Sequence, residues 1–285
     1  MTKKPFHTKI LSGRELAGFI KERQARQVAA LNEHTKLVIL RDSDNPVILK
    51  YVSLKQRYGA DIGIEVEDKL INTDELTSVI DELNKDTSVT AMIVQLPILE
   101  PARTDDIVNH ITPIKDVDNL SGRAPYTPAT AEAIDWLLAG YDIKLAGKHI
   151  GIVGQGRLVG APLTKLWSNA GHDITVFTRG DDLTNLQKCD IIVSATGVPH
   201  IITADLVKNG AIIVDAGTAS DHGVIKGDVD DAVRNRSDLI AITPTIGGVG
   251  PLTVSVLFDH VIAAASAWYN RLHGTFLRFF YTRQL

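Results

Sequence analysis

Three glycines near the middle of the chain stand where a strand would pass into a helix. The apolar run His149 to Val153 is followed by glycines at 154, 156 and 160, and then by a helix-like segment from Leu163 to Ala170. Glycines let the backbone approach a pyrophosphate, and the free N–H groups and dipole of a helix N-terminus favour its negative charge. The turn therefore favours dinucleotide binding, although a glycine-rich turn can also serve tight packing alone.

A tyrosine and a lysine four residues apart, Tyr51 and Lys55, lie in a segment with helical periodicity, so their side chains share one face. Most lysines on helices are simply solvated, but a partly desolvated lysine has a lowered pKa and can transfer protons. Gln95 interrupts an apolar strand at its carboxyl end, where open parallel sheets bind ligands. A buried amide needs hydrogen-bond partners, which Lys55 or a ligand amide could supply.

Two further segments could take part in binding. Asp116 and Asp118 flank Val117 in a loop, where aspartates commonly cap turns. Residues 243–253 contain three glycines within four residues, followed by a proline and the start of a helix. Such a backbone can approach a flat ligand closely, or it can serve as a hinge between domains.

Hydrophobic periodicity predicts the framework that must position these residues. The first half predicts helices at 9–32, 49–58 (ended by Gly59) and 73–84, and strands at 35–40, 62–66 and 90–95. After a loop at 113–128, the second half predicts helices at 129–139, 162–170 and 252–269, and strands at 149–153, 173–177, 190–194, 211–215 and 239–242. This alternation predicts parallel sheets covered by helices, with a Rossmann-like series in the second half.

The composition argues for a small-molecule partner. The 285 residues suffice for two domains, and 44% of them are hydrophobic, as in ordinary soluble globular proteins. A net charge of −4 with both signs mixed argues against nucleic acid and membranes. The single cysteine, Cys189, excludes an internal disulfide, and the nine histidines form no close ligand pair, so we expect no metal. The polar N-terminus, and the lack of an apolar run of membrane-spanning length, favour a cytoplasmic protein.

Several short motifs occur in the order and spacing of one enzyme family. They are Tyr51-x-x-x-Lys55, Val94-Gln-Leu-Pro97, Pro113-x-Lys-Asp-Val-Asp118, Thr127-Pro128, Val159-Gly-x-Pro162, Gly227-Asp-Val229 and Gly247-Gly-Val-Gly-Pro-x-Thr253. Over nearly its whole length, except for the first few residues and the tail, the chain resembles the methylenetetrahydrofolate dehydrogenase/cyclohydrolase family. The resemblance implies NAD(P)-dependent oxidation of 5,10-methylenetetrahydrofolate and hydrolysis of the product to 10-formyltetrahydrofolate.

The same resemblance implies an α/β fold of two domains with the folate in a cleft between them. The folate-binding catalytic domain would comprise residues 1–125 and 252–285, and the doubly wound Rossmann domain residues 126–251. By resemblance, Tyr51 packs on the folate ring, Lys55 transfers protons, Gln95 orients Lys55 and Asp118 grips the pterin. The substrate would also contact Val94, Leu96, Gly250 and Pro251, and the cofactor would contact Thr127, Gly154, Gln155, Gly156, Gly160, Arg179, Thr218, Gly248 and Thr253.

The cofactor turn departs from the family pattern. After Gly154 the family usually has Arg-Ser, and that arginine commonly meets the 2′-phosphate of NADP, but this chain has Gln155-Gly156. Arg179 could take over the phosphate, whereas Asp181 and Asp182 could instead accept from a ribose hydroxyl, as in NAD enzymes. We favour NADP, with NAD as the alternative. Further departures lie in or near the expected cleft, at Asn119, Tyr126, Thr130, Ile246 and Leu252, where glycine, cysteine, glycine, proline and methionine are usual.

Two other functions remain open at this point. The chain could be a monofunctional dehydrogenase, although the retained Lys55 and Gln95 argue against it, or a non-catalytic dinucleotide-binding regulator on the same scaffold. Family members are commonly dimers joined through the Rossmann domain, so the resemblance implies a homodimer. The tail carries Phe276, Phe279 and Phe280 beside two arginines, and we interpret it as a packing segment rather than a membrane contact.

Overall fold

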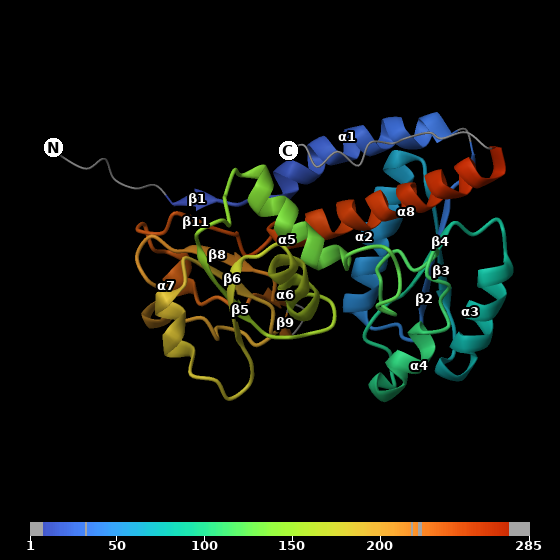
Figure 1. The fold of residues 1–285 in the computed structure, drawn as a ribbon. Coiled ribbons are helices and arrows are strands. Elements are labelled where there is room, and N and C mark those ends of the chain that lie inside the picture. The colour runs from blue at the N-terminus through green and yellow to red at the C-terminus, as the bar shows by residue number, and fades with distance from the viewer. Residues whose placement is uncertain (1–7, 32, 218, 222–223, 274–285) are drawn as a thin grey trace. The chain divides into compact units, whose positions relative to one another are not determined.

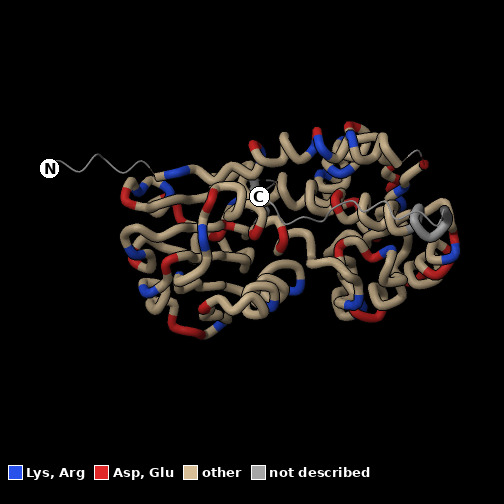
Figure 2. Tube along the Cα trace, turned by 45° about the horizontal axis from the view of Figure 1, so that its top comes forward, with Lys and Arg blue, Asp and Glu red and all other residues tan. Residues whose placement is uncertain are grey.

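The computed structural model describes residues 8–31, 33–217, 219–221 and 224–273, and these divide into two compact units. The three-stranded unit contains the described residues within 18–129 and from 254 to 273, and the six-stranded unit contains the described residues from 8 to 17 and within 130–253 (Figure 1). Basic and acidic residues are interspersed along the described chain (Figure 2). The aromatic tail and Thr218 lie outside the described residues.

The three-stranded unit is built on a parallel sheet of β2 (Lys36–Arg41), β3 (Glu65–Leu70) and β4 (Ala91–Val94), in the order β3-β2-β4. Two helices, α2 (Pro46–Ile62) and α3 (Leu76–Lys85), connect the strands on opposite faces of the sheet (Figure 1). Val38 and Leu40 of β2 pack against Leu76 and Ile80 of α3 in a buried cluster. A 3-10 turn (Thr73–Glu75) precedes α3, and a second turn (Pro101–Arg103) and the short helix α4 (Thr104–Val108) follow β4.

The six-stranded unit is a parallel sheet in the order β1-β11-β8-β7-β5-β6, which confirms the Rossmann-like prediction. Its strands are β1 (Lys9–Ile10), β5 (His149–Val153), β6 (Asp173–Phe177), β7 (Ile191–Ser194), β8 (Ile212–Asp215) and β11 (Ala241–Ile242). Its other elements are α6 (Gly160–Asn169), α7 (Asp231–Arg234), 3-10 turns at Leu183–Lys188 and Ala204–Leu206, and the hairpin β9 (Ala219–Asp221) with β10 (Val224–Lys226). Because β6 and β7 flank β5, the order of the strands reverses at β5, and such a switch point is where parallel sheets bind ligands.

Three helices complete the chain: α1 (Gly13–Leu31), α5 (Ala129–Gly140) and α8 (Val249–His273). One expectation about them was wrong. No membrane-spanning stretch was expected, but Val249–Ala267 of α8 is long and apolar enough to cross a membrane by length and composition. Most of this stretch is buried inside the protein, as in the core helix of a globular domain. Phe258, for example, is fully buried and stacks on Tyr58 of α2.

Several element boundaries also differ from the predictions; the strand predicted at 62–66, for example, is β3 at Glu65–Leu70. Residues 9–10 form β1 rather than the start of a helix, because Lys9 and Ile10 pair with Ala241 and Ile242 of β11. Such a pairing over two residues leaves no periodic signal in the local sequence. Helix α2 runs past Gly59 to Ile62 and ends at Gly63, which has a φ of 85°. Gly59 is instead a packing position, since a Cβ there would lie 2.4 Å from the Val66 side chain.

Candidate active site

Lys55 and Gln95 meet at the carboxyl edge of the three-stranded sheet. Lys55 lies on α2, whose start is set by Pro46 and by the Asn45 side chain, which accepts a hydrogen bond from the N–H of Val47. Gln95 follows β4 directly. The Lys55 Nζ donates to the Gln95 Oε1 at 2.6 Å, and the Gln95 Nε2 donates to the carbonyl of Leu96 at 3.1 Å. The amide of Gln95 is therefore oriented with its oxygen toward the lysine.

Burial shifts the pKa values of Lys55 and Asp118 in opposite directions. Desolvation lowers the pKa of Lys55 to about 8, and the negative charge of Asp118 opposes this shift. Desolvation raises the pKa of Asp118, while the hydrogen bond from the N–H of Ala129 and the positive charge of Lys55 oppose this shift. In both groups burial disfavours the charged form. Lys55 is thus suited to exchange a proton near neutral pH.

The two aspartates of the 113–118 segment serve different purposes. Asp116 is fully buried and accepts hydrogen bonds from the N–H groups of Leu120 and Ser121 and from the Ser121 hydroxyl, so it caps the loop. Asp118 is half-buried and accepts from the N–H of Ala129 at 3.1 Å. Of these two aspartates, Asp118 is the one whose charge raises the pKa of Lys55. Asp116 therefore caps the turn, while Asp118 interacts electrostatically with Lys55.

The other predicted substrate residues of this unit surround the same edge. Tyr51 is half-buried on α2, one helical turn before Lys55. Val94 is buried at the end of β4, and Leu96 is half-buried and precedes Pro97 through a cis peptide bond. The structure thus brings Lys55 and Gln95 into direct contact and places Tyr51, Val94 and Leu96 beside them in the chain.

The glycine turn lies at the switch point of the six-stranded sheet. Gly154, with a φ of 99°, follows β5, and a Cβ there would lie 2.6 Å from the carbonyl oxygen of Ala195, which follows β7. A Cβ on Gly160 would lie 2.0 Å from the Gly154 carbonyl oxygen, whereas a Cβ on Gly156 would meet no protein atom within 4 Å. The fold itself therefore needs Gly154 and Gly160. Gly156 leaves the backbone open at the start of α6, and this fits a pyrophosphate.

Gln155 acts within the turn. Its Nε2 donates to the Gly154 carbonyl at 3.1 Å and to the Thr164 hydroxyl at 2.9 Å, while the Thr164 hydroxyl donates to the Gly160 carbonyl. The glutamine thereby ties the glycine turn to the first turn of α6. A neutral amide in this place cannot supply the charge of the arginine that is usual in the family.

The turn after β6 carries one cation and two carboxylates, and their hydrogen-bond partners differ. Arg179 is exposed and has no hydrogen bond or ion pair with any other residue that the structure describes. Asp181 accepts from the N–H and hydroxyl of Thr178, and Asp182 accepts from those of Thr184. These hydrogen bonds lower the pKa values of both aspartates. Both carboxylates thus have local capping roles.

Asp228 is a buried support that sequence reasoning did not assign, although its motif was noted. It is fully buried, and its Oδ2 accepts from the Ser194 hydroxyl at 2.7 Å and from the N–H and hydroxyl of Thr196 at 2.7 and 2.9 Å. Thr196 follows β7, at the switch point. Nearby, Asp215 is paired with Arg234 and accepts from the N–H of Gly217. The one signal in the sequence was an aspartate between a glycine and a valine, outside any predicted strand.

The remaining predicted residues have varied surroundings. Thr127 and Pro251 are half-buried, Gly250 is exposed, and Gly248 is buried with Thr243 and Pro244 around its Cα. The Thr253 hydroxyl lies 3.4 Å from the Val249 carbonyl within α8. Among the described residues, no group of three histidine, cysteine or acidic side chains is arranged to hold a metal ion.

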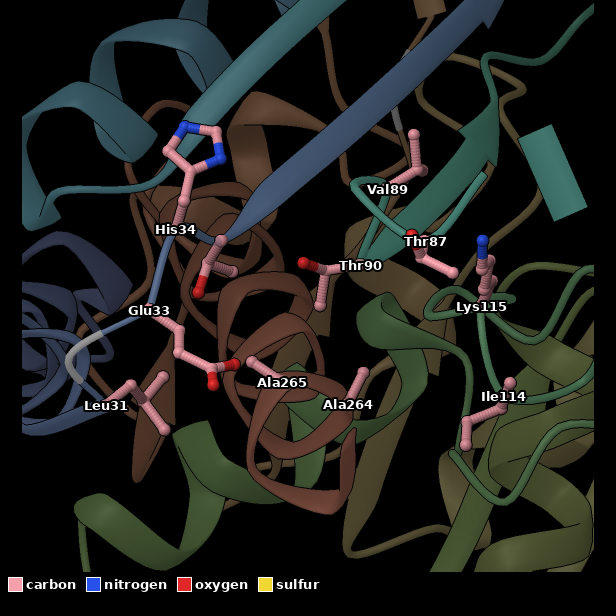
Figure 3. Close-up of a pocket in the computed structure, with 11 residues that line it drawn as sticks. Leu31, Glu33, His34, Thr87, Val89, Thr90, Ile114, Lys115, Ala264 and Ala265 are labelled. Atoms are coloured by element: carbon pink, nitrogen blue, oxygen red, sulfur yellow. The ribbon is translucent and has the colours of Figure 1, made fainter. Parts of the chain in front are cut away.

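A cavity of about 220 Å³ lies elsewhere in the three-stranded unit (Figure 3). It is lined by Thr35 and Thr90, which precede β2 and β4, and by Lys115 and Ala264 among others. It therefore lies at the amino ends of the strands, and Gln95 follows their carboxyl ends. The Lys115 Nζ donates to the carbonyls of Leu83 and Asp86, each at 2.7 Å. None of the predicted site residues lines this cavity.

One unit carries a glycine turn at a switch point, and the other carries a lysine-glutamine pair at the edge of its own sheet; together these features define an α/β enzyme with a dinucleotide-binding unit. Comparison with known proteins narrows this class. Residues 11–118 match the tetrahydrofolate dehydrogenase/cyclohydrolase catalytic domain, and residues 128–268 match the NAD(P)-binding domain of the same family. The chain belongs to the tetrahydrofolate dehydrogenase/cyclohydrolase family.

Individual relatives agree with this assignment. The bifunctional protein FolD of Lactobacillus delbrueckii is 37% identical over 284 residues, which cover 93% of this chain and 98% of the relative. Among solved structures, the bifunctional FolD dehydrogenase/cyclohydrolase of Campylobacter jejuni has a TM-score of 0.85 at 31% identity, covering 92% of this chain and 99% of the other. The Trypanosoma brucei dehydrogenase-cyclohydrolase, complexed with NADP cofactor and inhibitor, has a TM-score of 0.84 at 26% identity, covering 92% and 98%.

Proposed function

We propose that this protein oxidises 5,10-methylenetetrahydrofolate to 5,10-methenyltetrahydrofolate with NADP and hydrolyses the product to 10-formyltetrahydrofolate. The observation that carries the proposal is the contact between the Lys55 Nζ and the Gln95 Oε1, with a lysine pKa of about 8. A dehydrogenase step alone requires orientation and the exclusion of water rather than a proton carrier. A tuned lysine therefore supports the hydrolytic step.

Bound NADP would supply a hydride acceptor for the methylene bridge, and loss of the hydride would leave the folate as its methenyl cation; the backbone at Gly154, Gly156 and Gly160 would hold the cofactor. In the second step water adds to the methenyl carbon and gives up a proton to the neutral amine of Lys55. The bond between that carbon and N5 then breaks, N5 takes a proton from the lysine, and the second proton of the water leaves to solvent. Gln95, which accepts from Lys55, orients the amine throughout these transfers.

We assign the binding roles as follows, on the resemblance of their motifs. The catalytic group comprises Lys55, Tyr51, Gln95 and Asp118, and the substrate would also contact Val94, Leu96, Gly250 and Pro251. The cofactor would contact Thr127, Gly154, Gln155, Gly156, Gly160, Arg179, Thr218, Gly248 and Thr253. The corresponding domains would comprise residues 1–125 with 252–285, and residues 126–251.

The choice of NADP over NAD rests on the turn after β6. An NAD enzyme holds the ribose hydroxyl with an acidic residue near this point, but Asp181 and Asp182 accept hydrogen bonds from Thr178 and Thr184. Arg179 carries the charge that a 2′-phosphate requires, and it has no partner among the described residues. The related T. brucei enzyme was solved with NADP. We further propose a cytoplasmic homodimer, as the resemblance implies.

A spectroscopic assay tests the proposal directly. Purified protein is mixed with methylenetetrahydrofolate and either NADP or NAD, and cofactor reduction and methenyltetrahydrofolate hydrolysis are followed separately. We expect both reactions, with a higher kcat/KM for NADP than for NAD. Cofactor reduction without hydrolysis would indicate a monofunctional dehydrogenase, and the absence of both would favour a non-catalytic regulator.

A further inference from the structure

The loop after Asp118 is closed by the side chain of Asn119. This residue has a φ of 49°, in the left-handed region that asparagine tolerates better than most residues do. Its Nδ2 donates to the carbonyl of Tyr126 at 2.7 Å, and its Oδ1 accepts from the N–H of Ala124 at 2.9 Å. One side chain thus joins both ends of the segment 119–126.

The far end of the loop is held by an aromatic stack. The Tyr126 ring stacks on His260 of α8, with the ring centroids 4.7 Å apart and the planes inclined by 22°. His260 is fully buried, and its Nδ1 lies 2.8 Å from the carbonyl oxygen of Val117. Because a carbonyl can only accept, Nδ1 carries the hydrogen and donates it. His260 therefore holds the residue before Asp118 and the ring at the other end of the loop.

These contacts form a closed circuit around Asp118. It runs from His260 to Val117, across Asp118 to Asn119, from Asn119 to Tyr126, and back to His260. The circuit fixes the backbone on both sides of Asp118, and the carboxylate is further held by the N–H of Ala129. A carboxylate whose neighbours are fixed in this way loses little conformational entropy when it binds a ligand.

We propose that Asn119, Tyr126 and His260 are positioning residues that set the affinity for the folate through Asp118. The inference rests on the proposed function, in which Asp118 contacts the substrate. It also links two departures from the family pattern. A glycine at 119 could adopt the same φ but could not make either hydrogen bond, and a cysteine at 126 could not stack on His260. The two departures are therefore coupled parts of one support.

The test uses variants of the full-length protein and two readouts. Asn119→Gly keeps the backbone conformation and removes the hydrogen bonds, Tyr126→Ala removes the stack, and Tyr126→Phe is the matched control that keeps the ring. We expect Asn119→Gly and Tyr126→Ala to raise the KM for methenyltetrahydrofolate about tenfold, because misplaced binding groups typically cost at least this much. The KM for NADP and the kinetics of Tyr126→Phe should stay at parent values.

A double-mutant cycle and hydrogen exchange complete the test. In the Asn119→Gly/Tyr126→Ala variant the rise in the KM for methenyltetrahydrofolate should be smaller than the product of the two single rises, because both substitutions act on one loop. Backbone hydrogen exchange over residues 117–127 should quicken in both single variants, while exchange in β4 of the same variants stays unchanged. In Tyr126→Phe, exchange over residues 117–127 should match the parent. An unchanged folate KM, or an equal rise in the KM for NADP, would overturn the inference. A parent protein without either activity would instead overturn the proposed function, and with it the role assigned to Asp118.

Discussion

The carboxyl edges of the two parallel sheets use buried polar groups in different ways. At the edge of the three-stranded sheet, Lys55 and Asp118 are half-buried, and desolvation shifts both pKa values toward the neutral forms. At the edge of the six-stranded sheet, Asp228 is fully buried and accepts three hydrogen bonds from Ser194 and Thr196. The first edge keeps its ionisable groups available for exchange, and the second uses its carboxylate to hold a loop.

The first edge is therefore suited to proton transfer, and the second edge is suited to binding a ligand. A proton carrier must cross between charge states, so it needs partial burial and few fixed partners. A binding surface needs a fixed backbone, and Gly154, Gly160 and Asp228 supply it at the switch point. Substitution of the proton carrier at the first edge should therefore change hydrolysis more than cofactor reduction, while substitutions at the second edge should change cofactor binding more than hydrolysis.

The largest effect is expected from Lys55→Met. Without the amine, methenyltetrahydrofolate hydrolysis should fall about 10³-fold, as is typical for loss of a general acid-base group, while dehydrogenase kcat stays within several-fold of the parent. Lys50→Met on the exposed face of the same helix is the matched control and should leave both rates unchanged. Hydrolysis by Lys55→Met at the parent rate would show that Lys55 is not the proton carrier of this reaction.

Arg179→Ala should weaken NADP binding while leaving NAD binding unchanged. Loss of a charge-assisted contact costs about 1.5–3 kcal/mol, which corresponds to a rise in the KM for NADP of roughly 10- to 100-fold. Lys188→Ala, another exposed cation in the same unit, serves as the control. Steady-state kinetics with both cofactors measure the effect. Equal losses with NADP and NAD would show that Arg179 does not meet the 2′-phosphate.

Asp228→Asn should loosen the Thr196 loop, because the neutral amide accepts more weakly than the carboxylate. We expect a rise of about tenfold in the KM for NADP with hydrolysis of methenyltetrahydrofolate preserved. Asp238→Asn, which alters an aspartate paired with Arg236, is the comparison. If hydrolysis fell in step with cofactor binding, Asp228 would support the whole fold rather than the cofactor loop.

The glycine turn can be tested with a pair of alanine variants. Gly160→Ala places a Cβ against the Gly154 carbonyl, so it should lower the Tm without ligand by roughly 5 °C or more. Gly156→Ala meets no protein atom, so its Tm should match the parent, while its KM for NADP rises several-fold. Thermal melts without cofactor, followed by kinetics, distinguish packing from ligand approach. A lowered Tm in Gly156→Ala would assign that glycine to packing.

The smallest expected effect is a shift in a pH profile. Below a pH of about 8 Lys55 is protonated and cannot accept a proton, so kcat/KM for hydrolysis should rise with pH and level off above that value. In Gln95→Leu the acceptor that favours the charged lysine is lost, so the midpoint should move to lower pH by less than about one unit. A midpoint that moved to higher pH would contradict the orientation assigned to the amide.

Local patterns predicted much of the framework. The strands at 149–153 and 173–177 have the predicted bounds, because their apolar residues are continuous and are bordered by turns. Residues 9–10 were predicted wrongly, since β1 exists only through its pairing with β11. Gly59 was predicted as a helix end, but its missing Cβ instead lets the side chains of Val66 and Phe258 pack closely against α2. At residues 9–10 the deciding segment, β11, lies far outside any local window, and at Gly59 the contacts depend on how β3 and α8 pack against α2.

The sequence by itself determined the alternation of strands and helices, the glycine turn and the family, because periodicity and spacing are properties of the chain. Only the tertiary structure decided how distant residues meet. It brings Lys55 to Gln95, gives Asp116 and Asp118 different surroundings, and closes the circuit from Asn119 through Tyr126 to His260. These relations depend on strand order and on which side chains lose their water when the elements pack, and burial of this kind sets both pKa values and geometry.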